Sequence, residues 1–429
     1  MIARLLAVLV LAFAAPAAAE TLAIVDARLV TLGPAGDIAK GTIVLRDGRI
    51  AALGRDVRPP AGARIIDGEG LIVTPGLVAT VTPLGLNDLI GSGWPGLTSS
   101  ADRLSAGFSV AADYNPDNVQ IPEARVEGVT RAVVTPNPPP ASKSGGRKAF
   151  AGQAALVSLG EGRPPILDAA VAVVASGGDA GAAAAGGGRG ARRTLVSEQL
   201  ALARLHARTP GAVTPDRLEA LSLSQADLEA LRPVVAGRAP LLVEANRAAD
   251  IAMVLDLARA EKVRVILSGA ADAWRLADEI AAAGVPVVLD AEENQAFTFE
   301  TVNATYENAA ILHAAGVKIA FKPGIARIVF LIRTPRFLAG RTVRYGLPWE
   351  AALAAITRNP AEMFGYADEA GTLEVGKAAD LVVWSGDPLE TRTVARHVVI
   401  GGEVQPLTSR SRLLRDRYIE DVRAAAAAR

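Results

Sequence analysis

Polar side chains able to bind a ligand or transfer a proton follow several apolar runs in the second half of the chain. Each run has the length of a buried strand, so we expect each of these side chains at a strand end. They are Glu244, Asn246, Ser268, Asp290, Glu292, Glu293 and Lys322. A carboxylate and a lysine can act as acid and base without a metal. The same residues can instead line a remodelled binding pocket. They can also be hydrated groups at the open end of a sheet or barrel that binds no ligand.

Residue types that commonly bind metals or act as nucleophiles are scarce in this chain. It has three histidines and no cysteine, which removes disulfides and thiol chemistry. His206, His313 and His397 are far apart in sequence, and we expect ordinary surface or partly buried residues there. The segment Gly91–Gly96 fits G-x-G-x-x-G, but it follows no clear strand and opens no helix, so it does not predict a dinucleotide site.

The composition indicates a large globular protein without affinity for nucleic acid. With 429 residues, half of them hydrophobic, the chain can fold as one α/β barrel plus a smaller module. Its 45 basic residues are balanced by 45 acidic ones, so the basic surface that a phosphate backbone requires is missing.

The N-terminus has the pattern of a secretory signal peptide. Arg4 precedes an apolar run that ends in Ala17-Ala18-Ala19, and this run is too short to span a bilayer. No later stretch reaches the length of a membrane span. We therefore expect an exported protein without a membrane span, most simply located in a bacterial periplasm.

Strand-like and helix-like segments alternate through the middle of the chain. Apolar runs beginning at Ala239, Val263, Val285 and Val317 are separated by stretches with helical character. Four such units in a row favour a parallel barrel or a doubly wound sheet. The first 72 residues, by contrast, contain short strands and the hairpin signal Asp47-Gly48.

Two further segments differ in composition from the rest. Residues 175–193 are rich in glycine and alanine, which predicts a flexible loop. Residues 409–429 are charged and have helical character, which predicts a solvated helical tail.

Three segments resemble the amidohydrolase superfamily, in particular its imidazolonepropionase-like, metal-dependent hydrolase branch. PGLVATVTPLG from Pro75 is similar to the family's PGLIDAHTHLG, and AALAAITRNPAEMFG and GTLEVGKAADLVVWSGDP from Ala351 and Gly371 are similar to its C-terminal region. The resemblance implies a (β/α)8 TIM-like barrel beside a small β-sandwich built from N- and C-terminal strands. The implied division is a signal peptide (1–19), the first part of the sandwich (20–72), the barrel (73–371), the second part of the sandwich (372–407) and the tail (408–429).

The family binds metal through histidines, a lysine and an aspartate at the barrel mouth, and the resemblance assigns each to a position here. The family's two histidines of the first strand fall at Val81 and Pro83, and its metal-bridging lysine falls at Ser158. Two further histidines fall at Glu244 and Gly269, and the aspartate falls at Gly324. The resemblance therefore implies a barrel that has lost its metal ligands, and we expect no metal and no other cofactor.

Two functions remain open at this stage. The first is a metal-free pseudoenzyme that acts as a binding protein or as a partner subunit, in a homo-oligomer or in a hetero-oligomer with an active amidohydrolase homologue. The alternative is a hydrolase that acts on carbon–nitrogen, non-peptide bonds through a divergent, metal-independent site.

A lone carboxylate in the vacated mouth needs a cation nearby. Lys322 lies two residues before Gly324 and should face the same side of its strand. We therefore expect the Lys322 ammonium within about 4 Å of a carboxylate, with Glu244 as first choice and Asp290 or Glu292 next.

Overall fold

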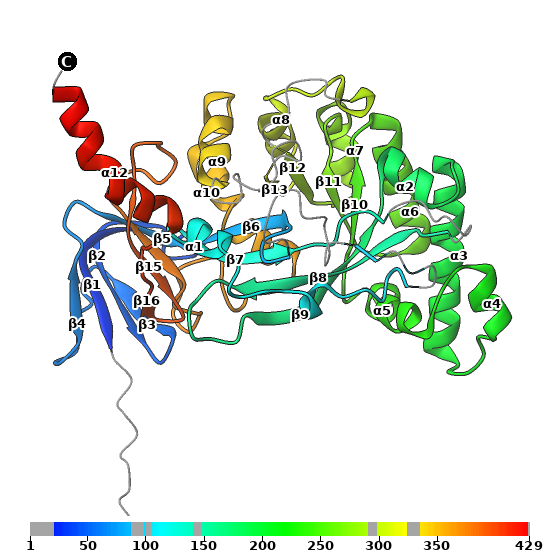
Figure 1. Ribbon diagram of the computed structural model, residues 1–429, viewed down its shortest axis with the longest axis horizontal. Helices are drawn as coiled ribbons and strands as arrows, with labels where there is room; N and C mark the ends of the chain where they lie inside the picture. Colours follow the sequence, from blue (N-terminus) through cyan, green and yellow to red (C-terminus); the bar gives the residue numbers. More distant parts are fainter. Residues whose placement is uncertain are drawn as a thin grey trace, which may run out of the picture.

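The computed structural model describes residues 21–86, 98–99, 101, 104–139, 147–290, 298–323 and 335–427. The expectations for the signal peptide, for Gly91–Gly96, for Glu292 and Glu293 and for Gly324 lie outside the described residues. The described residues form two eight-stranded sheets and the helices packed against them (Figure 1).

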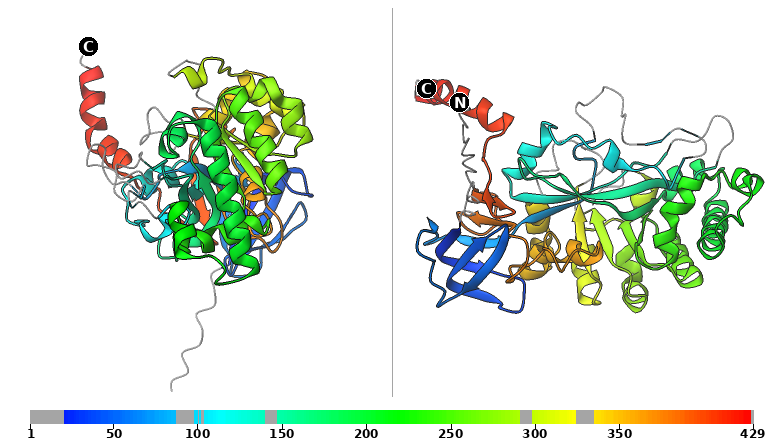
Figure 2. Two further views of the ribbon diagram at one scale, coloured as in Figure 1. Left: turned by 90° about the vertical axis from the view of Figure 1, so that its right-hand side faces the viewer. Right: turned by 90° about the horizontal axis from the view of Figure 1, so that it is seen from below.

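The first sheet is built from both ends of the chain. Its order is β16-β15-β14-β5-β1-β2-β3, with β4 beside β1, and Figure 2 shows the N-terminal strands (blue) next to the C-terminal ones (orange to red). The strands are β1 (Leu22–Val30), β2 (Asp37–Arg46), β3 (Arg49–Gly54), β4 (Arg64–Asp67), β5 (Ile72–Pro75), β14 (Leu381–Trp384), β15 (Ala395–Ile400) and β16 (Glu403–Val404). The antiparallel pairing of β5 with β14 joins the two ends.

Two tight turns of this sheet follow directly from sequence. Asp47 and Gly48 connect β2 to β3 with φ of 53° and 75°, and Gly401 and Gly402 connect β15 to β16 with φ of 55° and 83°. Two successive residues with positive φ form the hairpin turn that matches the twist of the flanking strands. The hairpin predicted at Asp47-Gly48 is confirmed.

The second sheet runs through eight consecutive strands, from β6 to β13, and nearly closes on itself. The strands are β6 (Leu77–Thr82), β7 (Val129–Val134), β8 (Phe150–Ser158), β9 (Ile166–Ala175), β10 (Leu241–Ala245), β11 (Val265–Gly269), β12 (Val287–Asp290) and β13 (Ile319–Lys322). The Thr80 hydroxyl on β6 donates to the Phe321 carbonyl on β13, which brings the two ends of the sheet together. The fold is therefore α/β with a nearly closed eight-stranded barrel sheet.

This barrel sheet departs from a regular (β/α)8 pattern in its first half. The strands from β9 to β13 are parallel, as are β6 and β7, but β8 is antiparallel to both of its neighbours. The connection from Ser158 to Ile166 is too short for a parallel crossover, which needs a dozen or more residues, and this requires β8 and β9 to run antiparallel.

Helices cover the barrel sheet, mostly beside its parallel half (Figure 1). The α-helices of the barrel region are α1 (Gln120–Arg125), α2 (Gly178–Ala184), α3 (Arg189–Arg208), α4 (Pro215–Ala220), α5 (Gln225–Val235), α6 (Ala248–Glu261), α7 (Ala277–Ala282), α8 (Asn308–Ala314), α9 (Pro335–Arg344), α10 (Trp349–Ala354) and α11 (Arg358–Met363). Short 3-10 helices are η1 (Val110–Ala112), η2 (Ala273–Leu276) and η3 (Phe299–Thr301), and α12 (Arg410–Ala427) is the predicted C-terminal helix. In the part of the chain that the structure describes, no helix is long and apolar enough to cross a bilayer.

The prediction of a flexible loop over residues 175–193 is wrong. The segment contains all of α2 and the start of α3, separated by Gly186 and Gly187 with φ of 103° and 115°. Alanine has the highest helix propensity, and here this preference outweighs the effect of the glycines, including Gly181 inside α2.

A buried ion pair connects the two sheets. The Arg131 Nε of β7 lies 2.6 Å from Asp380 Oδ2, with 9% and 6% of the two side chains exposed. Asp380 Oδ1 also accepts a hydrogen bond from the Gly401 amide at 2.7 Å. Nearby, Gly128 lies so close to Trp384 that a Cβ would come within 2.5 Å of the indole ring. The junction is therefore fixed by charge and by close packing.

We predict that Arg131→Met destabilises the protein by about 3–5 kcal/mol, because it leaves the Asp380 carboxylate buried without its cation. The free energy of unfolding in urea measures the effect. The exposed pair Arg259–Asp256 is the control, since Arg259→Met should cost no more than about 1 kcal/mol. Equal losses for the two variants would show that the junction does not depend on this ion pair.

A second prediction concerns His397 on β15, where burial, followed by the charges of Arg64 and Arg396, lowers the pKa of the imidazole below its ordinary value of 6.5. The unfolded chain then binds the proton more readily, so this contribution to stability is complete above about pH 7 and declines as the pH falls through the unfolded pKa. His397→Gln should flatten the fall in unfolding free energy between about pH 7.5 and pH 5.5. An unchanged slope in the variant would contradict this.

Candidate functional site

Alternate residues of the parallel strands face the inside of the barrel. One apolar cluster contains Leu242, Ile266, Val288 and Ala320 together with Met363 and Phe364. The intervening strand residues, such as Val243, Leu267 and Phe321, belong to a second cluster with residues of the covering helices. Because side chains alternate along a strand, the residues two positions beyond the first group face inward at the carboxyl ends of the strands. These are Glu244, Ser268, Asp290 and Lys322.

Strand register places these four side chains on two levels. Glu244 pairs with Ser268, and Ser268 pairs in turn with Val288. Asp290 pairs with Lys322 and therefore lies one inward-facing position beyond that level. Asn246 follows β10 directly, and its Oδ1 lies 2.4 Å from where a Cβ on Gly269 would be. The mouth thus has a lower level of Glu244 and Ser268 and an upper level of Asp290 and Lys322.

Lys322 is buried, with 4% of its surface exposed, but the expected ion pair is not formed with Glu244 or Asp290. Among the described residues, no ion pair joins the Lys322 ammonium to a carboxylate. The register explains why Glu244 is too far. It lies three strands away, at about 4.8 Å per strand, and on the lower level.

The residues that the resemblance assigns to ligand positions do not fit a divalent metal. Val81 and Pro83 have no lone pair to donate, and Gly269 has no side chain. Val81 also has a φ of 50°, which is rare for a β-branched residue and marks local backbone strain. Within the described ranges, no group of three or more His, Cys, Asp or Glu side chains is placed to hold a metal ion.

The assignment of Ser158 to a ligand position is corrected by the direction of β8. Ser158 ends this antiparallel strand beside Arg131, near the start of β7. It therefore lies at the opposite end of the barrel sheet from Glu244, where its Oγ accepts a hydrogen bond from Gly160 at 3.3 Å.

A small cavity of about 10 Å³ lies at the ends of β10 to β12. Its polar lining comes from Asn246, Asp290, Thr305 and Asn308. The Asn308 amide donates to the carbonyls of Ala270 (2.9 Å) and Ala271 (3.3 Å), and its buried Oδ1 accepts no hydrogen bond from the described residues. This volume has room for roughly one water molecule, which would satisfy that oxygen.

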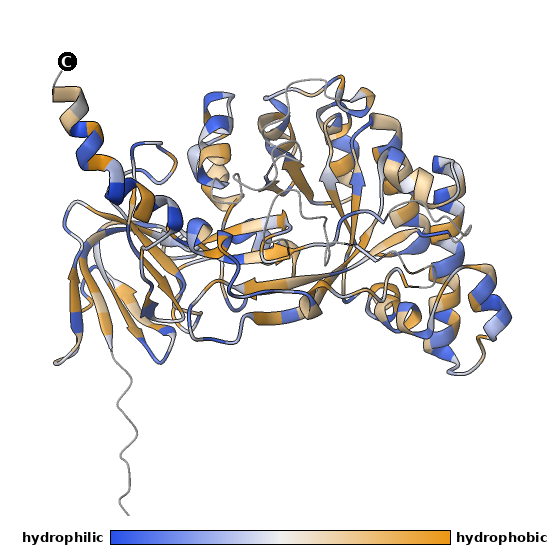
Figure 3. Ribbon diagram, viewed as in Figure 1, coloured by the Kyte–Doolittle hydropathy of each residue, from blue (hydrophilic) through white to orange (hydrophobic). Residues whose placement is uncertain are grey.

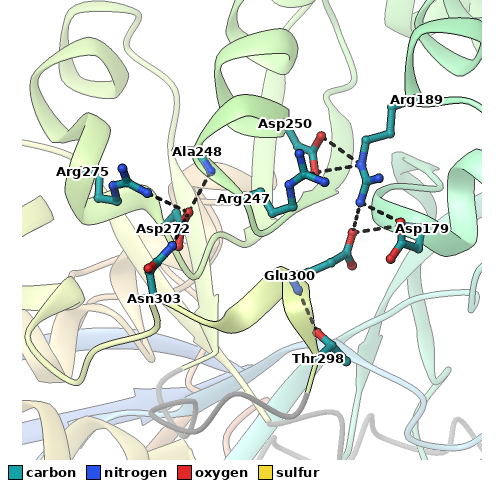
Figure 4. A network of polar contacts seen from close by, with 10 residues as sticks. All are labelled: Asp179, Arg189, Arg247, Ala248, Asp250, Asp272, Arg275, Thr298, Glu300 and Asn303. Carbon is teal, nitrogen blue, oxygen red and sulfur yellow. Dashed lines mark hydrogen bonds and ion pairs between the residues drawn. The ribbon is translucent and has the colours of Figure 1, made fainter.

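A network of ion pairs around Arg189 connects helical segments at the mouth (Figure 4). The Arg189 guanidinium lies 2.8 Å from Asp179, 3.1 Å from Asp250 and 2.6 Å from Glu300. Glu300 Oε1 also accepts the Asp179 amide at 2.9 Å. These carboxylates come from the segments after β9, β10 and β12, so one guanidinium holds three mouth segments together.

The segment after β11 is connected to the neighbouring mouth segments through Asp272. Its Oδ2 accepts hydrogen bonds from the Ala248 amide at 3.1 Å and from Asn303 Nδ2 at 3.3 Å. The Asn303 carbonyl accepts the Trp274 indole N–H at 3.0 Å. Sequence reasoning missed these residues, and the only available signal was the pair of charges, Asp179 and Arg189, inside a glycine- and alanine-rich tract.

The three histidines lie in separate elements. His206 on α3 has its Nε2 at 2.8 Å from Glu229 Oε1, and this contact is the main cause of a lowered pKa for the Glu229 carboxyl. His313 is on α8 and His397 on β15, so neither lies at a strand end of the mouth.

Known proteins similar to this chain include an amidohydrolase and several imidazolonepropionases. A sequence model of the Amidohydrolase family matches residues 330–405. Amidohydrolase tasK of Hapsidospora irregularis is 40% identical over 67 residues, which are 16% of this chain and only 7% of that protein. The imidazolonepropionase of Mesorhizobium japonicum is 26% identical over 415 residues, covering 84% of this chain and 90% of its own.

Solved structures of other proteins are similar over most of the chain. The amidohydrolase from Thermotoga maritima superposes with a TM-score of 0.78 at 22% identity, covering 89% of this chain and 99% of that one. At this identity the likeness concerns the fold. The matches to the first curated relatives span less than a fifth of those proteins.

We predict that Arg189→Met costs on the order of 2 kcal/mol, less than a fully buried pair, because 23% of the Arg189 side chain is exposed. Hydrogen exchange should speed up at the amides of α2, because Asp179 and Glu300 lose their shared cation. Arg193→Met on the exposed side of the same helix is the matched control and should leave both measurements unchanged. Unaltered exchange in Arg189→Met would show that the network does not hold the mouth.

Proposed function

This chain belongs to the amidohydrolase superfamily, and from that premise we propose that it is an exported, metal-free member whose barrel serves in binding instead of hydrolysis. The observation that carries the proposal is the donor set at the mouth. Val81, Pro83 and Gly269 have no metal-binding atoms at positions where the family's chemistry requires imidazoles.

The state of the surrounding scaffold supports the same conclusion. The barrel sheet is nearly closed, and Arg189, Asp250 and Glu300 hold the mouth segments in a fixed arrangement. A fold maintained without its metal chemistry remains useful as a binding surface or as a partner subunit. We propose a protein partner, either a second copy or an active homologue.

The finer architecture and the location are part of the proposal. We propose that the barrel derives from a (β/α)8 fold in which β8 replaces a helical crossover, and that the first sheet forms the β-sandwich. Packing of Ile24, Leu45 and Val383 in one apolar cluster supports the sandwich. The signal-like sequence before Glu20 supports export to a periplasm.

A metal-independent hydrolase of carbon–nitrogen bonds is the second candidate. It is favoured by the inward-facing carboxylate of Asp290 beside Lys322, since a carboxylate and an amine can serve as base and acid. Hydrolysis of an amide, lactam or imidazolone substrate that persists in excess chelator and is lost in Lys322→Met would favour this candidate over the first.

We predict that the protein purified from medium supplemented with zinc, manganese and iron contains far less than one equivalent of any of them. Elemental analysis of the protein measures this directly. About one metal per chain, lost when Glu244 and Asp290 are replaced by alanine, would overturn the metal-free proposal.

A further inference from the structure

The C-terminal helix α12 carries exposed apolar side chains that nothing in the described chain covers. Leu414, Tyr418 and Val422 are 41%, 51% and 60% exposed. They are spaced by four residues, so they form one stripe along the helix. Figure 3 shows apolar and charged residues interleaved along α12. An apolar stripe on a surface helix normally packs against another element.

The other side of α12 is the one that contacts the body of the protein. The Ser411 amide donates to Glu123 Oε1 at 2.7 Å, and Arg412 Nη2 donates to the Val126 carbonyl at 3.4 Å. Arg412 and Ile419 are half-buried, while Leu414, Tyr418 and Val422 are not. The helix then leaves the body, as Figure 1 shows. Its first turn is thus anchored, and the apolar stripe is presented to solvent in a fixed direction.

Charge along α12 is distributed unevenly. Residues 410–417 contain four arginines and one aspartate, and residues 420–423 contain Glu420, Asp421 and Arg423. A second copy of this helix, running antiparallel, would set the basic half of each against the acidic positions of the other. A parallel arrangement would instead set the two basic halves side by side, which like-charge repulsion disfavours.

We propose that α12 is a dimerisation helix, which pairs antiparallel with α12 of a second copy of this chain about a two-fold axis beside Tyr418. Leu414 packs against Val422 of the partner subunit, and Tyr418 packs against Tyr418 of the partner subunit. Arg417 lies near Asp421 of the partner subunit. Such a contact is self-complementary, as the commonest symmetry of soluble oligomers requires.

This inference deepens the proposed binding role by naming a surface, but it does not depend on what the barrel mouth binds. Its readout is the mass of the particle in solution, whereas the metal-free proposal is read from elemental content. A monomeric protein without metal would contradict the dimerisation proposal and leave the metal-free proposal intact. A dimer with stoichiometric metal would contradict the metal-free proposal and leave the dimerisation proposal intact.

The first test compares two neighbouring leucines in the full chain. Sedimentation equilibrium of the wild type should give a monomer–dimer equilibrium, and Leu414→Glu should raise its dissociation constant by at least about 10-fold, because each dimer loses two apolar contacts of its interface. Leu413→Glu is the matched control. Leu413 is 59% exposed and lies about 100° away around the helix, so this variant should dimerise like the wild type. Circular dichroism checks that both variants keep their helix content.

Three results would overturn the proposal: a wild type that is monomeric at all concentrations, a Leu414→Glu protein that dimerises normally, or equal weakening by the two leucine variants. The last result would mean that the two substitutions act through the fold of the helix and not through a shared face.

A charge exchange tests the antiparallel direction. Arg417→Asp should weaken the dimer, because it sets an aspartate against the partner's Asp421. Adding Asp421→Arg to the same chain restores opposite charges across the pair and should return most of the lost affinity. A double variant as weak as Arg417→Asp alone would reject the antiparallel arrangement.

Discussion

The buried ion pair between Arg131 and Asp380 is the contact on which the relation of the two sheets depends. Arg131 belongs to the second strand of the barrel sheet, and Asp380 directly precedes the C-terminal strand β14. Charges in a protein interior persist when each has its partner and its remaining hydrogen bonds, and Asp380 has both through Arg131 and the Gly401 amide. Since β14 pairs with β5, this one carboxylate positions the N-terminal strands, the C-terminal strands and the barrel relative to one another.

The barrel mouth shows a second constraint, which is strand register. Alternation along each strand determines which side chains face inward. From sequence, a position at a strand end could be predicted for Glu244, Ser268, Asp290 and Lys322, and the inward direction for Lys322. Their height along the barrel could not, because it depends on hydrogen-bond pairing accumulated over several strands. For this reason the expected contact of Lys322 with Glu244 is not formed. The direction of β8 also depends on strand pairing, so neither this direction nor the position of Ser158 could be predicted from sequence.

Local backbone conformation could be predicted from sequence more reliably than contacts between distant residues. The turn at Asp47-Gly48, the four parallel strand runs and the C-terminal helix follow from residue types that favour one backbone conformation. Residues 175–193 show the limit of composition as a guide, because their order depends on Arg189 finding Asp250 and Glu300, which are 61 and 111 residues away. Such contacts have no local signal, and propensity alone does not predict whether a small-residue segment will be ordered by them.

Both sheets are completed by contacts between residues far apart in sequence, and this determines when the chain can fold. Thr80 meets Phe321 across 241 residues, and Trp384 donates to the Thr74 hydroxyl across 310. The barrel sheet cannot be completed before β13 has been synthesised, and the first sheet cannot be completed before β14, β15 and β16. Folding that waits for such distant contacts is slow, since the entropy of closing the long loops must be lost first. For a protein proposed to be exported across a membrane, slow folding is an advantage, because the chain stays unfolded until the last strands have been synthesised.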